Sequence, residues 1–588
     1  MGGILGRLLH EFAVVIITAV LISGFVSLTL TPMMCSRILR PHAVAQRHGR
    51  LYMFFERAFD RSRDFYASSL KWTLDHRRAV MVFFLGVIVL TGVLFARAPT
   101  GFLPSEDSGQ LFIFTEGPQD VSFEQMAALQ HQVADLVQKD PNVESVMSFI
   151  GISGSSTQLN LGRVFIALKP FGQRKPADEV VRELRPKVAN LVGMKAFLQN
   201  IPSIRIGTLT KSPYQYVLQS ASTEQLYAWA PKIEQKLRTL PALVDLSSDL
   251  QIARPQVNIE IDRQKAAALG VTVQSIEAAL GSSYGQQQIS TIYTATNQYW
   301  VILEVEPKYQ NDPSLLSSLY VRSSTGALVP LDAVAKRSFS VGPLSVTHLG
   351  QLPSVTFSFD LRPGVALSEA IDQIRATSRE MQLPATVNAT FSGTAQAFQA
   401  SLQNMGVLLV LSIVVIYLVL GILYESFIHP LTILSGLPTA GLGALLTLMA
   451  FGIELNMYAF VGIIMLIGIV KKNAIMMIDF AIEAQRKEGR TAREAIYSAC
   501  MIRFRPIMMT TFAALMGTLP IALAIGSSGT GRQPLGLAVI GGLVVSQFLT
   551  LYLTPVIYIY FDRLQAGLGG RRAVRAMPAG ELSAKPAH

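Results

Sequence analysis

The chain has 588 residues, of which 50% are hydrophobic and only 15% charged, and its mean hydropathy is +0.38. This composition is too apolar for an ordinary water-soluble enzyme. The formal net charge of +11 lies beside apolar runs rather than on one polar domain, so it does not predict a nucleic-acid-binding surface.

Seven apolar runs are long enough to span a membrane, because a bilayer core about 30 Å thick is crossed by roughly 20 helical residues. Two of them precede a long polar stretch, residues 97–404, and five follow it. The runs are Phe12–Met34, Ala79–Ala96, Met405–Tyr424, Leu431–Phe451, Met457–Ala481, Ile507–Ile525 and Leu535–Tyr560.

The basic residues predict the orientation of these spans. Residues 36–78, between the first two runs, contain ten basic and four acidic residues, whereas residues 97–404 contain 25 basic and 26 acidic residues. By the positive-inside rule, the linker and the C-terminal tail are cytoplasmic and the long stretch lies outside. The first run would then cross the membrane from outside to inside, with Met1 on the outer side. Met1–Arg7 has no signal-peptide features that would explain this placement. We therefore expect a further segment to precede Met1.

The linker contains apolar residues at helical spacing with charged residues between them. This pattern predicts an amphipathic helix along the cytoplasmic membrane surface, although an ordinary linker helix would have the same geometry. The apolar positions are Leu51, Phe54, Phe55, Ala58, Phe65 and Leu70.

The long polar stretch repeats a strand–helix–strand pattern four times, at residues 111–149, 164–199, 214–247 and 355–391. Two such units make one split βαβ sandwich, so the pattern predicts two sandwiches. Residues 255–341 interrupt the second sandwich and are predicted to be an inserted domain. Within them, Gln286–Tyr293 is either an exposed hairpin arm for a partner or an ordinary β-hairpin.

The fifth span carries the only Lys, Arg, Asp or Glu residues within the apolar runs: Lys471 and Lys472, with Asn473 beside them, and Asp479 nearer one end. A charge at this depth costs about 2.5–3.5 kcal/mol, which favours a functional role. The alternative is snorkelling, but either lysine would have to climb more than two helical turns. Lys472 and Asp479 stand about 10 Å apart along the helix, too far for a direct pair. We therefore expect the carboxylate partner to come from another polypeptide segment.

This arrangement predicts a proton relay. A lysine beside carboxylates can exchange ion pairs when a carboxylate takes up a proton, and the resulting helix shifts can drive an outer domain. The expected energy source is the proton gradient, with no cofactor and no metal. No enzyme motif occurs at a membrane boundary, so we expect a secondary transporter rather than an enzyme.

Several local sequences resemble the multidrug, AcrB-like branch of the resistance–nodulation–division transporters, and the last two resemble its MdtB/MdtC subunit type. They are Phe102-Leu103-Pro104 with Glu106-Asp107, Leu423-Tyr424-Glu425-Ser426, Arg503 to Thr510, Gly468 to Met477 and Gly531 to Gly536. The resemblance covers nearly the whole chain, as the C-terminal half of a pump that exports small amphiphilic molecules in exchange for protons.

The resemblance implies an α-helical membrane bundle of seven spans and a periplasmic α+β loop with two split-βαβ (ferredoxin-like) porter subdomains and an inserted docking subdomain. In chain order, the implied domains are a span at 1–35, the linker at 36–78, a second span at 79–97 and a first porter subdomain at 98–205. A second porter subdomain is formed by 206–254 together with 342–395, and the docking subdomain at 255–341 is inserted between these two parts. The five-helix bundle at 396–562 and the tail at 563–588 follow.

The resemblance also implies functional residues. Lys472, Arg503 and Thr510 match the family's proton relay, and we add Lys471, Asn473 and Asp479; the relay's aspartates belong to the absent half. Lys471 departs from the AcrB type, which has a small residue there. The family's drug pocket implies roles for Met147, Phe149, Ile152 and Phe165, with core packing an equal alternative.

The implied setting is the bacterial inner membrane. The implied partners are the N-terminal half or full-length pump subunits in a homo- or heterotrimer, a periplasmic adaptor protein and an outer-membrane channel. Two alternatives remain at this point: a protein-export auxiliary of the same superfamily, and an inactive fragment of a split or truncated pump gene.

Overall fold

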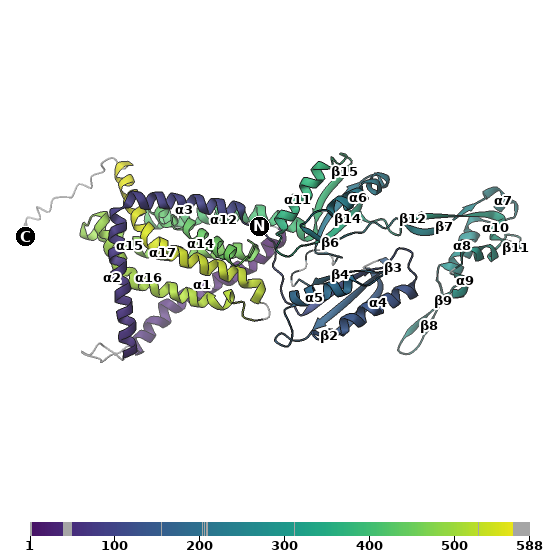
Figure 1. Ribbon diagram of the computed structural model, residues 1–588, viewed down its shortest axis with the longest axis horizontal. Helices are drawn as coiled ribbons and strands as arrows, with labels where there is room; N and C mark the ends of the chain where they lie inside the picture. Colours follow the sequence, from purple (N-terminus) through teal and green to yellow (C-terminus); the bar gives the residue numbers. More distant parts are fainter. Residues whose placement is uncertain are drawn as a thin grey trace, which may run out of the picture.

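The computed structural model describes residues 3–38, 50–153, 156–202, 204, 206, 210–310, 312–526 and 529–568. It consists of a helix bundle at one end and sheet-containing domains at the other (Figure 1). Residues 39–49 of the predicted linker and 569–588 of the predicted tail lie outside the described residues.

Seven helices in the described residues are long and apolar enough to cross a membrane, and each matches one predicted span. One of the seven is divided into two helices before Pro438, because proline has no N–H to continue the hydrogen-bond ladder. The seven are α1 (Gly3–Ile38), α3 (Arg77–Arg97), α12 (Gly393–Tyr424), α13 (Ile428–Leu434) with α14 (Leu437–Ala450), α15 (Met457–Glu488), α16 (Ala492–Ala522) and α17 (Gly529–Leu568).

Small residues let α14 and α17 pack closely in the centre of the bundle. A Cβ at Gly443 would overlap the carbonyl oxygen of Gly541, and one at Gly541 would overlap the Thr447 side chain. Small residues at such positions allow helix backbones to approach in membranes. By contrast, most apolar side chains of α1, α3 and α12 are exposed, so these three helices lie at the outside of the bundle.

Helix α2 (Arg50–Asp75) crosses the end of the bundle opposite the sheet domains (Figure 1). Its Tyr66 ring stacks on Phe504 at 4.8 Å, and its hydroxyl donates a 2.8 Å hydrogen bond to the carbonyl of Leu551. This packing covers only part of the predicted apolar positions, and the placement of the helix along the membrane surface stays a prediction. Leu70 is buried, but Phe54, Phe55 and Phe65 are at least 63% exposed. Periodicity identifies apolar positions along a helix, but not which of them a neighbouring helix covers.

Sheet domain 1 contains a four-stranded antiparallel sheet in the order β2-β3-β1-β4. Helices α4 and α5 cover one face of it, with Leu111 and Ile113 of β1 in the core between. The elements are β1 (Gln110–Glu116), α4 (Phe123–Gln138), β2 (Val143–Ser153), β3 (Ser156–Leu168), α5 (Ala177–Ala189) and β4 (Lys195–Asn200).

Sheet domain 2 is built from two chain segments that pair in one five-stranded sheet. Its strands run β13-β14-β5-β15, and β6 also pairs with β14. The elements are β5 (Tyr214–Ser220), α6 (Thr223–Leu237), β6 (Leu243–Ser248), β13 (His348–Leu349), β14 (Leu352–Leu361), α11 (Leu367–Glu380) and β15 (Val387–Ser392).

An inserted domain between the two segments forms the end of the molecule farthest from the bundle (Figure 1). The antiparallel strands β7 and β12 connect it to sheet domain 2. Its hairpin β8–β9 exposes apolar side chains, including Tyr293 and Trp300. The elements are β7 (Arg254–Ile261), α7 (Arg263–Ala268), α8 (Val273–Tyr284), β8 (Gln287–Tyr293), β9 (Gln298–Leu303), α9 (Pro307–Gln310), a 3₁₀ helix (Pro313–Ser318), β10 (Tyr320–Arg322), β11 (Leu328–Pro330), α10 (Leu331–Val334) and β12 (Ala335–Gly342).

Candidate functional site in the helix bundle

Helix α15 carries the predicted intramembrane charges at its middle. The Asn456 side chain caps its N-terminus by accepting a 3.0 Å hydrogen bond from the backbone N–H of Ala459. The helix ends at Gly489, which has a left-handed φ of 68°. This 32-residue helix places Lys471, Lys472 and Asn473 about halfway along its length.

A cavity of about 700 Å³, here called the central cavity, lies between α1, α12, α15, α16 and α17. Its walls are apolar apart from Lys472, Asn473, Thr510 and Thr511. Lys472 is exposed to this space, and no ion pair with it occurs among the described residues. The central cavity is therefore a largely apolar space with one cation in its wall. Three predicted relay residues meet there, namely Lys472, Asn473 and Thr510.

A buried hydrogen-bond network lies behind Lys472. The Asn473 side chain donates to Oε1 of Gln547 at 2.7 Å and to Oγ1 of Thr511 at 3.2 Å. The Thr511 hydroxyl lies 2.8 Å from the same Gln547 oxygen. Our sequence analysis missed Gln547. An amide within the last apolar run was the available signal, since a polar group at bilayer depth is costly unless it is paired.

Thr510 also lines the central cavity, half-buried, and its hydroxyl donates a 3.1 Å hydrogen bond to the carbonyl of Ile507. Lys471 is placed differently. It is only 4% exposed, it does not line the cavity, and its Nζ atom has no hydrogen-bond partner among the described residues. The two neighbouring lysines therefore face different surroundings, as expected for residues about 100° apart around a helix.

The remaining two predicted relay residues lie near the α2 end of the bundle. Asp479 and Arg503 line a separate cavity of about 560 Å³, together with Glu483, Arg486 and Lys487. The guanidinium carbon of Arg503 is 5.1 Å from the ring centre of Phe480, a cation–π distance. We call this group the end cluster. The structure thus divides the six predicted residues between the central cavity, the end cluster and the buried Lys471 site.

The predicted drug-pocket residues lie on the face of sheet domain 1 that is turned away from α4 and α5. Met147 pairs with Phe165 across β2 and β3, and the Phe149 and Phe165 ring centres are 6.2 Å apart. Phe165 packs against a cluster that includes Phe112, which the sequence analysis did not select. Met147 is 56% exposed. The side chain of Ile152 lies outside the described residues, although its backbone pairs with Thr157.

A third cavity, of about 830 Å³, lies between the two sheet domains. Its lining does not include Met147, Phe149 or Phe165. Three ion pairs cross this junction, two made by Arg185 and one by Lys211. Arg185 of α5 lies 2.8 Å from an oxygen of Asp360 in β14 and 3.4 Å from one of Asp245 in β6.

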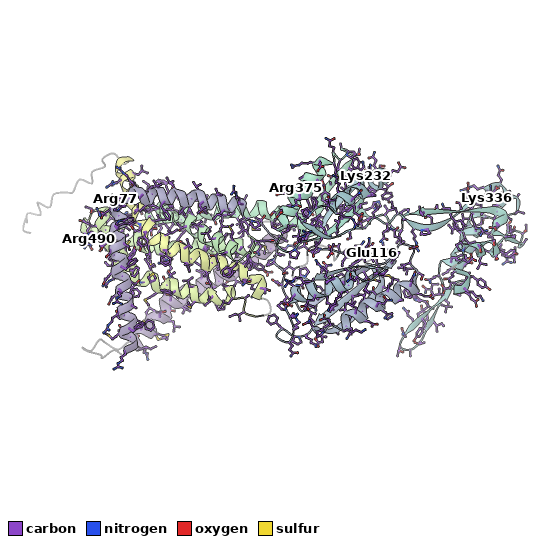
Figure 2. The ribbon with its side chains drawn as sticks, in the orientation of Figure 1. Arg77, Glu116, Lys232, Lys336, Arg375 and Arg490 are labelled. Carbon is purple, nitrogen blue, oxygen red and sulfur yellow. The ribbon has the colours of Figure 1, made fainter. Side chains whose placement is uncertain are left out.

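The third ion pair joins β1 to the segment before β5. Lys211 donates to Glu116 at 2.8 Å and to the carbonyl of Ser248 at 3.0 Å, and Figure 2 shows Glu116 between the two sheet domains. The junction therefore combines charged contacts with open space, which suits domains that change their relative position.

The chain was compared with known proteins. A model of the AcrB/AcrD/AcrF family matches residues 1–562. The chain is also similar to multidrug resistance protein MdtC of Salmonella agona (strain SL483). The identity is 45% over 572 residues, which cover 96% of this chain and 55% of that protein. The chain thus spans about half the length of this curated relative.

Proposed function

We propose that this chain, which belongs to the AcrB/AcrD/AcrF family of multidrug efflux transporters, forms the part of a proton-driven pump that carries the basic side of its proton relay. The resemblance to the MdtB/MdtC type that the sequence motifs indicated is confirmed. Family membership does not favour a membrane enzyme or a protein-export auxiliary.

The observation that carries this proposal is the single cation in the wall of the central cavity. A lysine in an apolar space needs a carboxylate beside it to remain charged. In the proposed pump that carboxylate belongs to a segment outside this chain. Its protonation would release Lys472 and let α15 and α16 shift, with Asn473 and Thr510 as hydrogen-bonding neighbours. The proton gradient is the energy source, and no cofactor takes part.

The end cluster is proposed to connect the relay with the cytoplasm. Asp479 stands about 10 Å from Lys472 along α15, and Arg503 a similar distance from Thr510 along α16. The basic residues of α2 and of residues 482–505 are at this end of the bundle, which by the positive-inside rule supports a cytoplasmic placement. Lys471 is proposed to modulate the relay from its separate buried position.

The sheet domains are proposed to be periplasmic porter subdomains that handle small amphiphilic substrates. The strand order β2-β3-β1-β4 with two helices on one face supports a split βαβ arrangement in sheet domain 1. The apolar surface around Met147, Phe149 and Phe165 supports a role in substrate binding, to which Ile152 is assigned by sequence alone.

The proposed setting is a tripartite envelope assembly in the bacterial inner membrane. This chain would join an N-terminal half or full-length pump subunits in a homo- or heterotrimer. The inserted domain would dock towards a periplasmic adaptor protein and an outer-membrane channel. These partners are proposed from family membership.

The test is transport by the assembled pump with Lys472→Ala in this chain. Proteoliposomes would receive an imposed pH gradient, and substrate movement and proton flux would be followed together. We expect both to stop, because no cation remains in the central cavity. Lys139→Ala, at the exposed C-terminal end of α4 and outside the lining of the cavities described above, is the control and should leave transport unchanged. Proton-coupled transport that survives Lys472→Ala would refute the relay assignment.

A further inference from the structure

A groove of about 730 Å³ lies on sheet domain 2, between the C-terminal part of α11, strand β15 and the first turns of α12. Its lining includes two arginines and several neutral hydrogen-bonding side chains but no Asp or Glu. Its polar side chains include Arg375, Arg379 and Gln399, with Gln382, Thr390 and Gln396 beside them. The chemistry of this lining suits an anion.

The two arginines have no carboxylate partner within the described part of the chain. Along α11, Asp372 is the acid nearest to Arg375 and Glu380 the acid nearest to Arg379; neither forms an ion pair with them among the described residues, and Glu380 lies 3.7 Å from Lys236 instead. The guanidinium carbon of Arg375 is 5.9 Å from the ring centre of Phe391 in the groove wall. Two unpaired cations on one side of a groove repel each other, and an anion between them would remove that repulsion.

Compensation of the helix dipole explains only part of this arrangement. Cations near a helix C-terminus are favourable, but the effect falls off within the last turn. Arg379 lies in the last turn of α11, which ends at Glu380. Arg375 lies one turn earlier, so its position needs another reason.

A neutral donor in the same groove also lacks an acceptor. The Nε2 atom of Gln399 is buried and has no hydrogen-bond partner among the described residues. A buried donor without an acceptor costs roughly 1–3 kcal/mol in general, so such atoms usually indicate a missing partner. An anion held by Arg375 and Arg379 would supply that acceptor.

The position of the groove indicates the source of the anion. Gln399 precedes Met405, where the apolar run of α12 begins, by six residues, which is about 9 Å along the helix. The headgroup region of a bilayer extends roughly 5–8 Å beyond each side of its hydrocarbon core. Figure 2 shows Arg375 where sheet domain 2 meets the bundle, whereas Lys232 of α6 lies farther from it. Arginine side chains are long enough to bridge the remaining distance, so a headgroup phosphate would lie within their reach.

We propose that this groove binds the phosphate of a phospholipid headgroup, between Arg375 and Arg379 on α11 and Gln399 on α12. The side chains of Leu383 and Phe391 would contact the glycerol end of the lipid. Bound lipid would tether sheet domain 2 to the membrane surface beside α12. The proposal concerns a surface apart from the central cavity, so it does not depend on the proposed transport function.

The test uses the full chain in nanodiscs of phosphatidylcholine that contain a small fraction of labelled phosphatidylglycerol. Lipid retained by the protein is counted by native mass spectrometry after gentle removal of the bilayer. We expect enrichment of phosphatidylglycerol on the parent chain. Arg375→Gln and Arg379→Gln should each lower it by roughly fivefold, the usual effect of one basic side chain at an anionic surface.

Two further variants keep the result interpretable. Gln399→Glu preserves side-chain size but places a carboxylate beside the arginines, so it should also abolish the enrichment with both arginines intact. Lys232→Gln removes a cation from the same domain outside the groove and should have no effect. Melting temperatures of all variants would show whether each remains folded.

Three outcomes would overturn the proposal. In the first, phosphatidylglycerol retention is the same for the parent, Arg375→Gln and Gln399→Glu. In the second, Lys232→Gln loses as much lipid as Arg375→Gln, which indicates non-specific surface charge. In the third, inorganic phosphate binds the detergent-solubilised chain with the same arginine dependence while lipid is not retained, which indicates a free-anion site.

Discussion

The side-chain amide of Asn473 donates a 2.7 Å hydrogen bond to Oε1 of Gln547, and this contact joins α15 to α17 in the middle of the bundle. The same oxygen lies 2.8 Å from the hydroxyl of Thr511 on α16. One glutamine thus connects three helices. Because Asn473 directly follows Lys472, the network also sets the rotation of α15 that turns Lys472 towards the central cavity.

Replacing Gln547 should therefore loosen the bundle. Gln547→Leu removes the acceptor for Asn473 and Thr511, and we expect a loss of about 0.6–1.7 kcal/mol, the range for interhelical hydrogen bonds in membranes. Unfolding by sodium dodecyl sulfate in mixed micelles would measure this loss in the free energy of unfolding. Phe548→Leu, at an adjacent position that is 66% exposed, is the control. Equal stability of the two variants would contradict a structural role for the network.

Asp107 should make the stability of sheet domain 1 dependent on pH. Burial would raise its pKa, but hydrogen bonds from Arg174 and from the backbone N–H groups of Ala177 and Gly109 together hold the pKa below its ordinary value. A depressed carboxyl pKa stabilises the fold above the ordinary value of about 3.9, and this contribution is lost as the pH falls through the folded-state pKa.

Asp107→Asn should accordingly destabilise sheet domain 1 at neutral pH by roughly 3 kcal/mol, the effect of breaking a buried ion pair. The difference from the parent should shrink below about pH 4. Hydrogen exchange of the β1 amides at several pH values would measure this difference in stability. Asp120→Asn, at an exposed position, is the control and should show no such difference. A pH-independent difference would show that the charge of Asp107 is not the cause.

The glycine contact between α14 and α17 should tolerate no added volume. Gly443→Ala places a methyl group against the backbone of Gly541, and overpacking of this kind costs about 1–3 kcal/mol. Gly517→Ala is a matched control, because a Cβ there meets no atom within 4 Å among the described residues. Melting temperatures in detergent should fall for the first variant only; an equal fall in both would argue against the close approach.

Removal of Arg185 should loosen the junction between the sheet domains. The three charged partners are 25–29% exposed, so the expected loss is about 1 kcal/mol or less. Burial raises the pKa of Asp245, while Arg185 opposes and Asp360 reinforces this rise. A raised carboxyl pKa favours the folded contact at low pH and disfavours it as the pH rises through that pKa.

In Arg185→Ala the pKa of Asp245 should rise further, because the opposing cation is gone. The domains should therefore separate at neutral pH and partly close again on acidification. Distances between spin labels on α5 and β14 would report both states. Arg182→Ala, in the same cavity wall, is the control. Label distances in Arg185→Ala that match the parent at every pH would rule out a latch at this position.

Local patterns in the sequence were sufficient to predict the elements. The seven apolar runs match seven helices, and the four strand–helix–strand units correspond to helices and strands whose ends differ by only a few residues, apart from the longer strands β2 and β3. Turn prolines such as Pro141 and Pro384 mark where helices stop, since proline disfavours helical backbone before it. These features depend on residues close together in the chain.

The grouping of side chains required the tertiary structure. Arg503 and Thr510 were predicted to act together, yet they line different cavities, because seven residues separate them by about 10 Å along α16. Likewise, the exposed Phe54 and the buried Leu70 of α2 are indistinguishable by periodicity alone.

The sequence by itself determined that Lys472 stands at bilayer depth without a carboxylate close enough to pair with it, because Asp479 lies about 10 Å away along the same helix. Only the tertiary structure decided that Lys472 faces the central cavity while Lys471 is buried elsewhere. It also showed that Gln547, 74 residues beyond Asn473, completes their hydrogen-bond network. Which face of a helix meets a neighbour depends on contacts between distant segments, and local sequence patterns do not encode those contacts.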